Sequence, residues 1–410
     1  MEKVLIGVIG KGQYDRETGR NDYRLTKYRL DDGTMKESKL VLDILKEQLK
    51  PEKIYIVGTK ESLWNVADEY IGDYEKVYIP YGKSPEEFWK IFEVLTELDI
   101  QDKEIHFDIT HGFRSIPLFV STLLNFFTKV KGASIGGVYY GIFEAKNDDG
   151  STPVVNMFPF LEMSRFVDAF YLFQKFSDGR EIAGIIQEKL KEIPVEQKKK
   201  FSKLQSLAKE LEFYSKSVGF SALRFYQNSL QKIEGIIEEI DKVPDSLRAT
   251  GFLMKDMTEE SGRLKGIKLH WQKDMMTAKL FFERNRYAQS LTILRETALT
   301  YILETLGLDV DDKDLREDSL SAIFKSESDN LEHKKDLRYF TKEWLKLFKK
   351  IRELRNKANH AFIQRSVGEK DIKKSVDNLR DFLVETERLM NEDRIILDKN
   401  SLKSALRGEL

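Results

Sequence analysis

The chain has 410 residues, in which 68 Lys and Arg against 69 Asp and Glu give a formal net charge of −1. This neutral balance argues against a dedicated duplex-binding protein, which usually carries a basic excess, but it leaves room for a small RNA site. The absence of cysteine excludes disulfides, thiolate metal sites and cysteine nucleophiles. The longest apolar segment, Ile116–Phe127, is well short of a membrane span, so we expect a cytoplasmic protein without a membrane partner.

Residues 1–160 alternate between strand-like and helix-like patterns. β-Branched or aromatic runs predict strands at Val4–Ile9, Lys53–Val57, Lys76–Ile79 and Glu104–Ile109, with helices between them near Glu37–Leu49, Glu61–Tyr70 and Pro85–Leu98. The region continues with a helix at Ser115–Val130 and an antiparallel edge pair at Ser134–Glu144 and Val154–Phe158, whereas Gln13–Tyr28 is typical of a polar loop. Strands separated by helices form a mostly parallel sheet, so the sequence predicts an α/β Rossmann-like domain.

Strand patterns fade after Phe160, and the rest of the chain predicts helices. We therefore expect an N-terminal α/β domain at residues 1–160, a helical connecting region at 161–270 and a further helical domain at 271–410. In the last region, Phe281–Leu306 has the spacing of a long amphipathic helix. The acidic stretch Asp309–Asn330 is typical of a surface connection with a short helix.

Polar, glycine-containing segments follow three of the predicted strands. They are Gly10-Lys11-Gly12, Gly58-Thr59-Lys60 and Asp108-Ile109-Thr110-His111-Gly112-Phe113-Arg114-Ser115. The carboxyl ends of parallel strands meet at one edge of a sheet, where open α/β folds bind ligands, and a helix N-terminus there favours an anion. The segments predict a nucleotide-like site, although Asp108 or Ser115 could instead cap the following helix.

The segment Arg355-Asn356-Lys357-Ala358-Asn359-His360 lies on a strongly predicted helix. The preceding apolar residues follow helical spacing, at Trp344, Leu347, Phe348, Ile351 and Leu354. Arg355 falls inside this apolar arc, and His360 lies about 140° around the helix from Arg355, nearly opposite the arc. A guanidinium that stabilises phosphorane charge, with an imidazole that moves a proton, suits cleavage of a phosphodiester.

No metal site is expected. His270 and His333 lack neighbouring ligands at metal-binding spacing. The acidic segment Asp309–Asp314 begins like a calcium loop, but Asp314 stands where the loop needs Gly and Leu320 where it needs Glu.

The motif D-I-T-H-G-F-R-S at Asp108–Ser115, followed by R-x(4)-H at Arg355–His360, resembles the CRISPR-associated CARF–HEPN proteins of type III antiviral systems. The resemblance implies a homodimer. Its CARF domains would bind a cyclic oligoadenylate activator, expected to be cyclic tetra-adenylate although the sequence does not determine ring size. Its paired HEPN domains would form a composite, metal-independent endoribonuclease that cleaves single-stranded RNA to a 2′,3′-cyclic phosphate without a cofactor.

The resemblance also assigns residues. Arg355 and His360 would be catalytic, with Asn356 and Asn359 as polar helpers. The ligand loops would contain Gly10, Lys11, Gly12, Tyr14, Thr59, Lys60, Asp108, Thr110, His111, Gly112, Phe113, Arg114 and Ser115.

Two other functions remain open from the sequence. The chain could be a catalytically silent nucleotide sensor whose helical half binds a protein or nucleic-acid partner, although the intact Arg355 and His360 argue against this. Alternatively, the α/β pocket could also cleave its own cyclic ligand, and the sequence does not separate that activity from simple binding.

Overall fold

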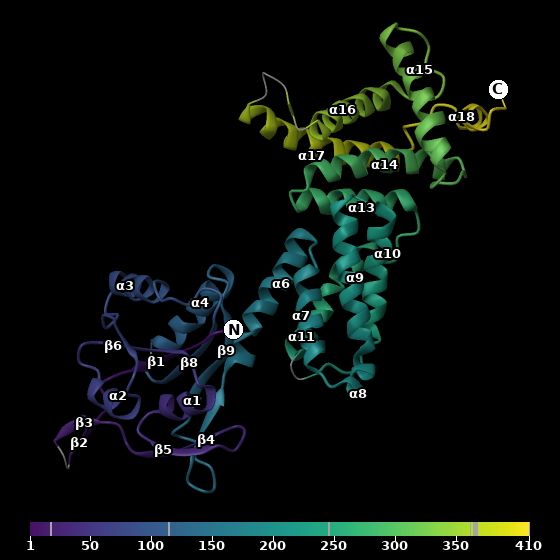
Figure 1. Cartoon of the computed structure of the whole chain (residues 1–410). Helices are drawn as coiled ribbons and strands as arrows, with labels where there is room; N and C mark the ends of the chain where they lie inside the picture. The colour runs from purple at the N-terminus through teal and green to yellow at the C-terminus, as the bar shows by residue number, and fades with distance from the viewer. Residues whose placement is uncertain (17–18, 114, 245–246, 361, 364–367, 410) are drawn as a thin grey trace. The chain divides into compact units, whose positions relative to one another are not determined.

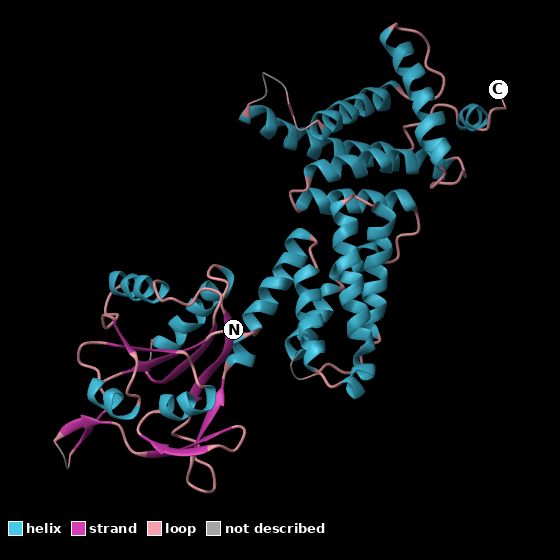
Figure 2. Cartoon of the chain, viewed as in Figure 1, coloured by secondary structure: helices cyan, strands magenta, loops and turns pink. Residues whose placement is uncertain are grey.

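The computed structural model of the chain describes residues 1–16, 19–113, 115–244, 247–360, 362–363 and 368–409. This described part divides into two compact units, Met1–Ser164 and Arg165–Leu410 (Figure 1). Within the described residues, the named strands all belong to the first unit and the second unit is helical (Figure 2), so the predicted fold class is confirmed. None of the described helices is long and apolar enough to cross a membrane.

The first unit is built on a mixed sheet. Its strands are β1 (Lys3–Ile9), β4 (Thr26–Leu30), β5 (Met35–Ser38), β6 (Lys53–Gly58), β7 (Glu75–Tyr78), β8 (Glu104–His111), β9 (Ser134–Gly141) and β10 (Thr152–Asn156). Within the described residues they lie in the order β5-β4-β10-β9-β8-β1-β6-β7. The neighbours from β9 to β7 all pair in parallel, as predicted, and β9 pairs antiparallel with β10.

Helices cover both faces of this sheet (Figure 1). They are α1 (Val41–Leu49), α2 (Trp64–Tyr70), α3 (Pro85–Thr96) and α4 (Ile116–Lys129), followed by the short α5 (Phe158–Leu161). Side chains of α1 and α2 share a core with Leu5 and Ile56, whereas those of α3 and α4 share another with Ile6 and Phe107. Because alternate strand residues face opposite sides, the buried runs of β1 and β8 serve both cores.

The stretch predicted as a polar loop is in fact largely extended. It forms the hairpin β2 (Gln13–Asp15) and β3 (Arg20–Asp22) and then β4, which pairs with β10 and β5 and extends the sheet past the predicted edge pair. Tyr28 and Leu30 are buried and alternate with exposed Lys27 and Arg29. This period of two is the signal that marks β4 as a half-buried strand.

The second unit is helical. Its helices are α6 (Met163–Phe176), α7 (Arg180–Glu192), α8 (Val195–Lys198), η1 (Lys199–Phe201), α9 (Ser202–Gly219), α10 (Leu223–Glu238), α11 (Arg248–Met257), α12 (Glu259–Leu264), α13 (His270–Glu283), α14 (Tyr287–Thr305), η3 (Leu315–Ser319), α15 (Leu320–Glu332), α16 (Lys342–Asn359), α17 (Glu369–Asn391) and α18 (Lys399–Leu406).

Two predictions about these helices were wrong. The single helix expected at Phe281–Leu306 is interrupted, because Asn285 adopts a left-handed conformation (φ 59°) between α13 and α14. The acidic stretch expected as a surface connection is mostly helix, in η3 and α15. Leu320 and Phe324 anchor α15, since both are almost completely buried.

Helix α16 carries the R-x(4)-H motif and is fixed from its start. The Thr341 hydroxyl caps it by accepting a hydrogen bond from the Trp344 backbone N–H at 3.2 Å. Trp344 and Ile351 are fully buried on the predicted apolar stripe, against α14, α15 and α17. The ring of Phe348 stacks on that of Phe324 in α15, with 4.3 Å between centroids.

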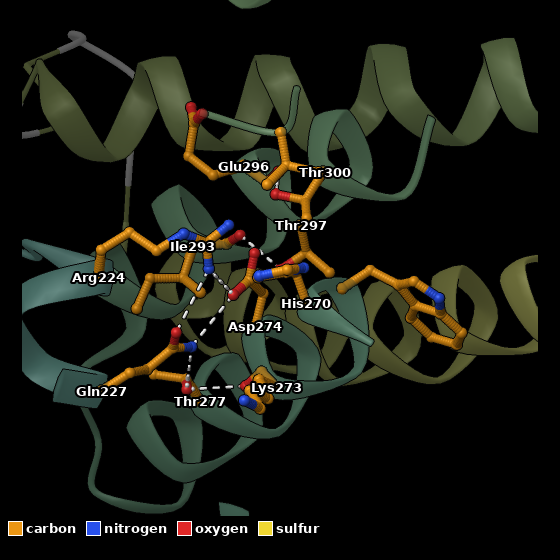
Figure 3. Close-up of polar contacts among 12 residues, drawn as sticks. Arg224, Gln227, His270, Lys273, Asp274, Thr277, Ile293, Glu296, Thr297 and Thr300 are labelled. Carbon is orange, nitrogen blue, oxygen red and sulfur yellow. Dashed lines mark hydrogen bonds and ion pairs between the residues drawn. The ribbon is translucent and has the colours of Figure 1, made fainter. Parts of the chain in front are cut away.

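A buried polar network joins α10 to α13 (Figure 3). Arg224 donates to the fully buried Asp274 carboxylate at 2.5 Å, and Gln227 donates to the same oxygen at 3.1 Å and to the Thr277 hydroxyl at 3.2 Å. Within the described residues, the other carboxylate oxygen of Asp274 has no hydrogen-bond partner. The carboxylate therefore depends on Arg224 for its counter-charge.

Candidate functional site

Arg355 lies in the last turns of α16 and is half-buried. Its Nε atom is buried and has no hydrogen-bond partner among the described residues, and one terminal nitrogen lies 3.5 Å from Asn356 Oδ1. Buried donors are nearly always paired in folded proteins, because an unmade bond carries the full desolvation penalty. The guanidinium is thus left with donors available for an anion.

His360 ends the same helix. Its backbone N–H donates to the Asn356 carbonyl at 3.0 Å, which fixes the chain, while its side chain is exposed, like that of Asn359. The imidazole borders a cavity of about 280 Å³, together with Asn356, Lys357 and Ile363.

Arg355 and His360 do not converge within one chain. Five helical residues separate them by about 7.5 Å along the axis and about 140° around it. The fold brings Asn356 beside Arg355, whereas His360 and Asn359 face outward. On the helix, the two residues are thus directed to different sides.

The other candidate site lies at the carboxyl ends of the strands. After β1, the Tyr23 hydroxyl accepts from the Gly10 N–H at 2.8 Å and donates to the Gly10 carbonyl at 2.9 Å. Gly12 has φ +66°, and a Cβ there would lie 2.6 Å from Leu63 Cδ1. Only glycine fits this turn without strain. Lys11 and Tyr14 are exposed beside it, Tyr14 to 67%.

The turn after β6 is fastened to the end of β1. Ser62 Oγ donates to the Ile9 carbonyl at 3.0 Å and accepts from the Thr59 N–H at 3.0 Å. Thr59 is buried by these contacts and Lys60 is exposed. Of this pair, only Lys60 presents its side chain to a ligand in solution.

Near the end of β8, Asp108 is buried, whereas the last three residues of the strand are only partly buried. Asp108 is 1% exposed and accepts from the Thr110 N–H at 3.0 Å, and burial raises the pKa of its carboxyl to about 6. Thr110 Oγ1 accepts from the Gly141 N–H at 3.0 Å. Asp108 therefore bonds its own strand rather than capping α4, and Ser115 makes no side-chain cap bond either.

His111 belongs to an aromatic cluster. Its ring lies 4.6 Å from that of Tyr23 and 5.8 Å from that of Phe143, and its Nε2 accepts from the Val41 N–H at 3.4 Å. Burial lowers the pKa of the imidazole to about 3, so the ring is neutral at physiological pH.

Two lysines of the neighbouring loops surround an aromatic residue that the sequence reasoning missed. Lys11 Nζ lies 4.9 Å and Lys83 Nζ 5.1 Å from the ring centroid of Tyr81, which also packs edge-on against Phe113 at 5.6 Å. The segment Tyr81-Gly82-Lys83 follows β7 and has the glycine and lysine that marked the other loops, so the same signal could have found it. Gly112 directly precedes Phe113 and Ser115 follows two residues after it, while the predicted Arg114 lies outside the described residues.

A metal centre is not evident in the described ranges, where no group of three or more His, Asp or Glu side chains could hold an ion. The site at the sheet edge is a cluster of loops with lysine and aromatic side chains. The site on α16 contains an arginine with a hydrogen-bond donor that no described residue accepts from.

No model of a known protein family matches the chain. In an alignment of 462 residues, it is 23% identical to the CRISPR-associated protein MJ1674 of Methanocaldococcus jannaschii, covering 97% of this chain and 68% of that protein. Among solved structures, the chain can be superposed on Enterococcus italicus Csm6 bound to cyclic hexa-2'-fluoro-hexa-dAMP, over 98% of this chain and 99% of that one. The TM-score is 0.34 and the identity 13%, a similarity too low to support an argument.

Proposed function

We propose that this chain, a CRISPR-associated protein of the CARF–HEPN family, is a cyclic-oligoadenylate-activated endoribonuclease that cleaves single-stranded RNA as a homodimer. The family assignment is supported by the relative that matches 97% of the chain and by the two motifs in their expected order. The α/β unit followed by a helical unit agrees with that order.

The observation that carries the proposal is the state of Arg355. Its Nε is buried and has no hydrogen-bond partner in the described part of the chain, and the end of its helix exposes His360. An arginine kept in that state is costly for stability, and an anion that accepts its hydrogen bonds would offset the cost. A phosphodiester supplies such an anion at the place where the imidazole of a second chain could reach it.

The chemistry follows from these two side chains. The 2′-oxygen of the RNA attacks the adjacent phosphorus, the bond from phosphorus to the 5′-oxygen breaks, and a 2′,3′-cyclic phosphate forms. His360 acts on the proton of the attacking or the departing oxygen, and Arg355 stabilises the negative charge on the phosphorane. Both groups are supplied by the protein, so the reaction needs no metal ion or cofactor.

The loops around Tyr81 are the proposed activator site. Lys11, Lys60 and Lys83 provide positive charge for phosphates, and Tyr81 provides a ring on which an adenine can stack. Binding would activate cleavage only through a higher affinity for the active arrangement of the dimer than for the inactive one.

The test is cleavage of a fluorescently labelled single-stranded RNA with and without cyclic tri-, tetra- and hexa-adenylate. We expect one of these rings to stimulate cleavage by wild-type protein, and His360→Ala to be inactive while it binds the same ring with unchanged affinity. Cleavage by the purified His360→Ala protein at the wild-type rate would refute the catalytic assignment.

A further inference from the structure

A cavity of about 180 Å³ lies beside Arg355 in the helical unit. Helix α14 contributes Arg295, helix α15 contributes Phe324, and helix α16 contributes Phe348, Arg352, Arg355 and Asn356. On α16, Arg352 follows Phe348 by four residues, and Arg355 and Asn356 follow Arg352 by three and four, a spacing that places them on one side of the helix. Packing of three separate helices thus brings three guanidinium groups to the same space.

The charges in this cavity are not balanced. No Asp or Glu among the described residues lines it, and an arginine keeps its charge at any physiological pH. Arg295 pairs with Glu296, but that carboxylate is shared with Arg316, which contacts it at 2.8 Å. Arg352 makes no hydrogen bond or ion pair within the described ranges, and Arg355 has its buried, unpartnered Nε. The cavity is therefore suited to an anion.

The cavity wall strengthens this preference. Phe324 and Phe348 are almost completely buried and stack on each other at its apolar side. An apolar wall lowers the local dielectric constant, so an anion held against it interacts more strongly with arginine than it would in water. Bidentate guanidinium contacts favour planar or tetrahedral oxyanions such as phosphate over a halide.

The position of the cavity points to the substrate. Asn356 lines this cavity and also the one beside His360, so the two are neighbours on the surface of α16. A strand of RNA that passes His360 can thus place another of its phosphates among the arginines. Resting on the proposed ribonuclease function, we propose that Arg295 and Arg352 form a phosphate-binding subsite that positions the RNA strand next to the cleaved bond.

The test measures RNA binding separately from cleavage, with the full-length protein. The probe is a fluorescein-labelled single strand with 2′-O-methyl groups throughout, which removes the attacking hydroxyl, and the readout is fluorescence anisotropy at several salt concentrations. We expect Arg352→Ala to weaken binding by roughly ten-fold or more, the usual effect of losing a charge-assisted contact. The slope of log affinity against log salt should fall by about 0.7, because one phosphate contact is lost. For cleavable RNA, KM should rise while kcat stays near the wild-type value.

Lys350→Ala is the matched control. It removes a positive charge from the same helix at an exposed position two residues away, which turns about 200° from Arg352. We expect its affinity and salt slope to equal those of wild-type protein. Arg352→Lys is the second variant, used if the alanine variant does not fold. Lysine keeps the positive charge but cannot make the two parallel hydrogen bonds of a guanidinium, so the salt slope should persist while the affinity for RNA falls several-fold.

Two results would overturn the subsite. One is wild-type affinity and salt slope in Arg352→Ala protein that is folded by circular dichroism. The other is unchanged RNA affinity together with a shifted dimer dissociation constant in sedimentation, which would mean that a carboxylate of a second copy fills the cavity. Failure of the ribonuclease proposal looks different, because wild-type protein would then neither bind nor cleave the RNA.

Discussion

The buried carboxyl of Asp108 leads to a prediction about stability and pH. Its pKa rises from the ordinary 3.8 to about 6 in the folded chain, because burial disfavours the charged form. Below pH 3.8 the group is protonated in both the folded and unfolded states and contributes nothing. As pH rises from 3.8 to 6, the unfolded chain loses this proton first, so the free energy of unfolding falls. Above pH 6 the full penalty of about 3 kcal/mol remains.

Asp108→Asn removes this penalty and keeps an oxygen that can accept from the Thr110 N–H. We expect the variant to gain about 2 kcal/mol more stability over wild type at pH 8 than at pH 4. Nearby titratable groups do not change this difference. His111 is present in both proteins, and Tyr23 and Tyr28 have pKa values raised by burial, so they stay neutral over this range.

The assay is urea unfolding of full-length wild-type and variant protein at pH 4, 5, 6, 7 and 8. The measured quantity is the difference in free energy of unfolding between variant and wild type at each pH. Any effect of the amide that does not depend on pH cancels when this difference at one pH is subtracted from that at another. A gain that is the same at every pH would show that the Asp108 carboxylate is already solvated or paired in the folded chain, and it would contradict the raised pKa of this carboxyl.

Three other outcomes can be measured. Arg224→Ala should lower the free energy of unfolding, measured with urea, by about 3 kcal/mol because it leaves the buried Asp274 carboxylate without a counter-charge. The double variant Arg224→Ala, Asp274→Asn should recover much of this loss. Lys83→Ala should raise the cyclic oligoadenylate concentration for half-maximal cleavage by roughly ten-fold, while Lys90→Ala on the exposed side of α3 should not; equal midpoints would place the activator elsewhere. Cleavage should persist in excess EDTA, and a loss that only magnesium or manganese restores would contradict the metal-independent mechanism.

Much of the fold could be predicted because its signals are local. The parallel strands are short apolar runs, and α16 shows its apolar stripe in the order of its residues. The errors arose where tertiary context decides. Nothing in the periodicity of the Phe281–Leu306 stretch shows that Asn285 turns left-handed and separates two helices. Likewise, β4 pairs with β10, which is far from it along the chain, and with β5, whose sequence has only a weak strand pattern.

The candidate sites divide in the same way. Arg355 and His360 could be singled out because a motif places them on one helix, and the outward direction of His360 follows from helical geometry. The juxtaposition of Arg295 with Arg352 could not, because it depends on how α14 packs on α16. The burial of His111 among aromatic rings depends equally on distant segments, since Tyr23 and Phe143 lie far from it along the chain.

The central claim is that two chains complete one ribonuclease site, and mixing two inactive variants tests it most directly. Arg355→Ala and His360→Ala proteins are each expected to be inactive. When equal amounts are mixed and allowed to exchange subunits, half of the dimers should contain one of each. In these mixed dimers, one of the two arginine–histidine pairs across the dimer is intact and the other has lost both residues. Because half of the dimers keep one of their two pairs, the mixture should recover about a quarter of wild-type cleavage in the presence of activator. A mixture that stays inactive although subunit exchange is verified would contradict the composite site, because it would mean that both residues must come from one chain.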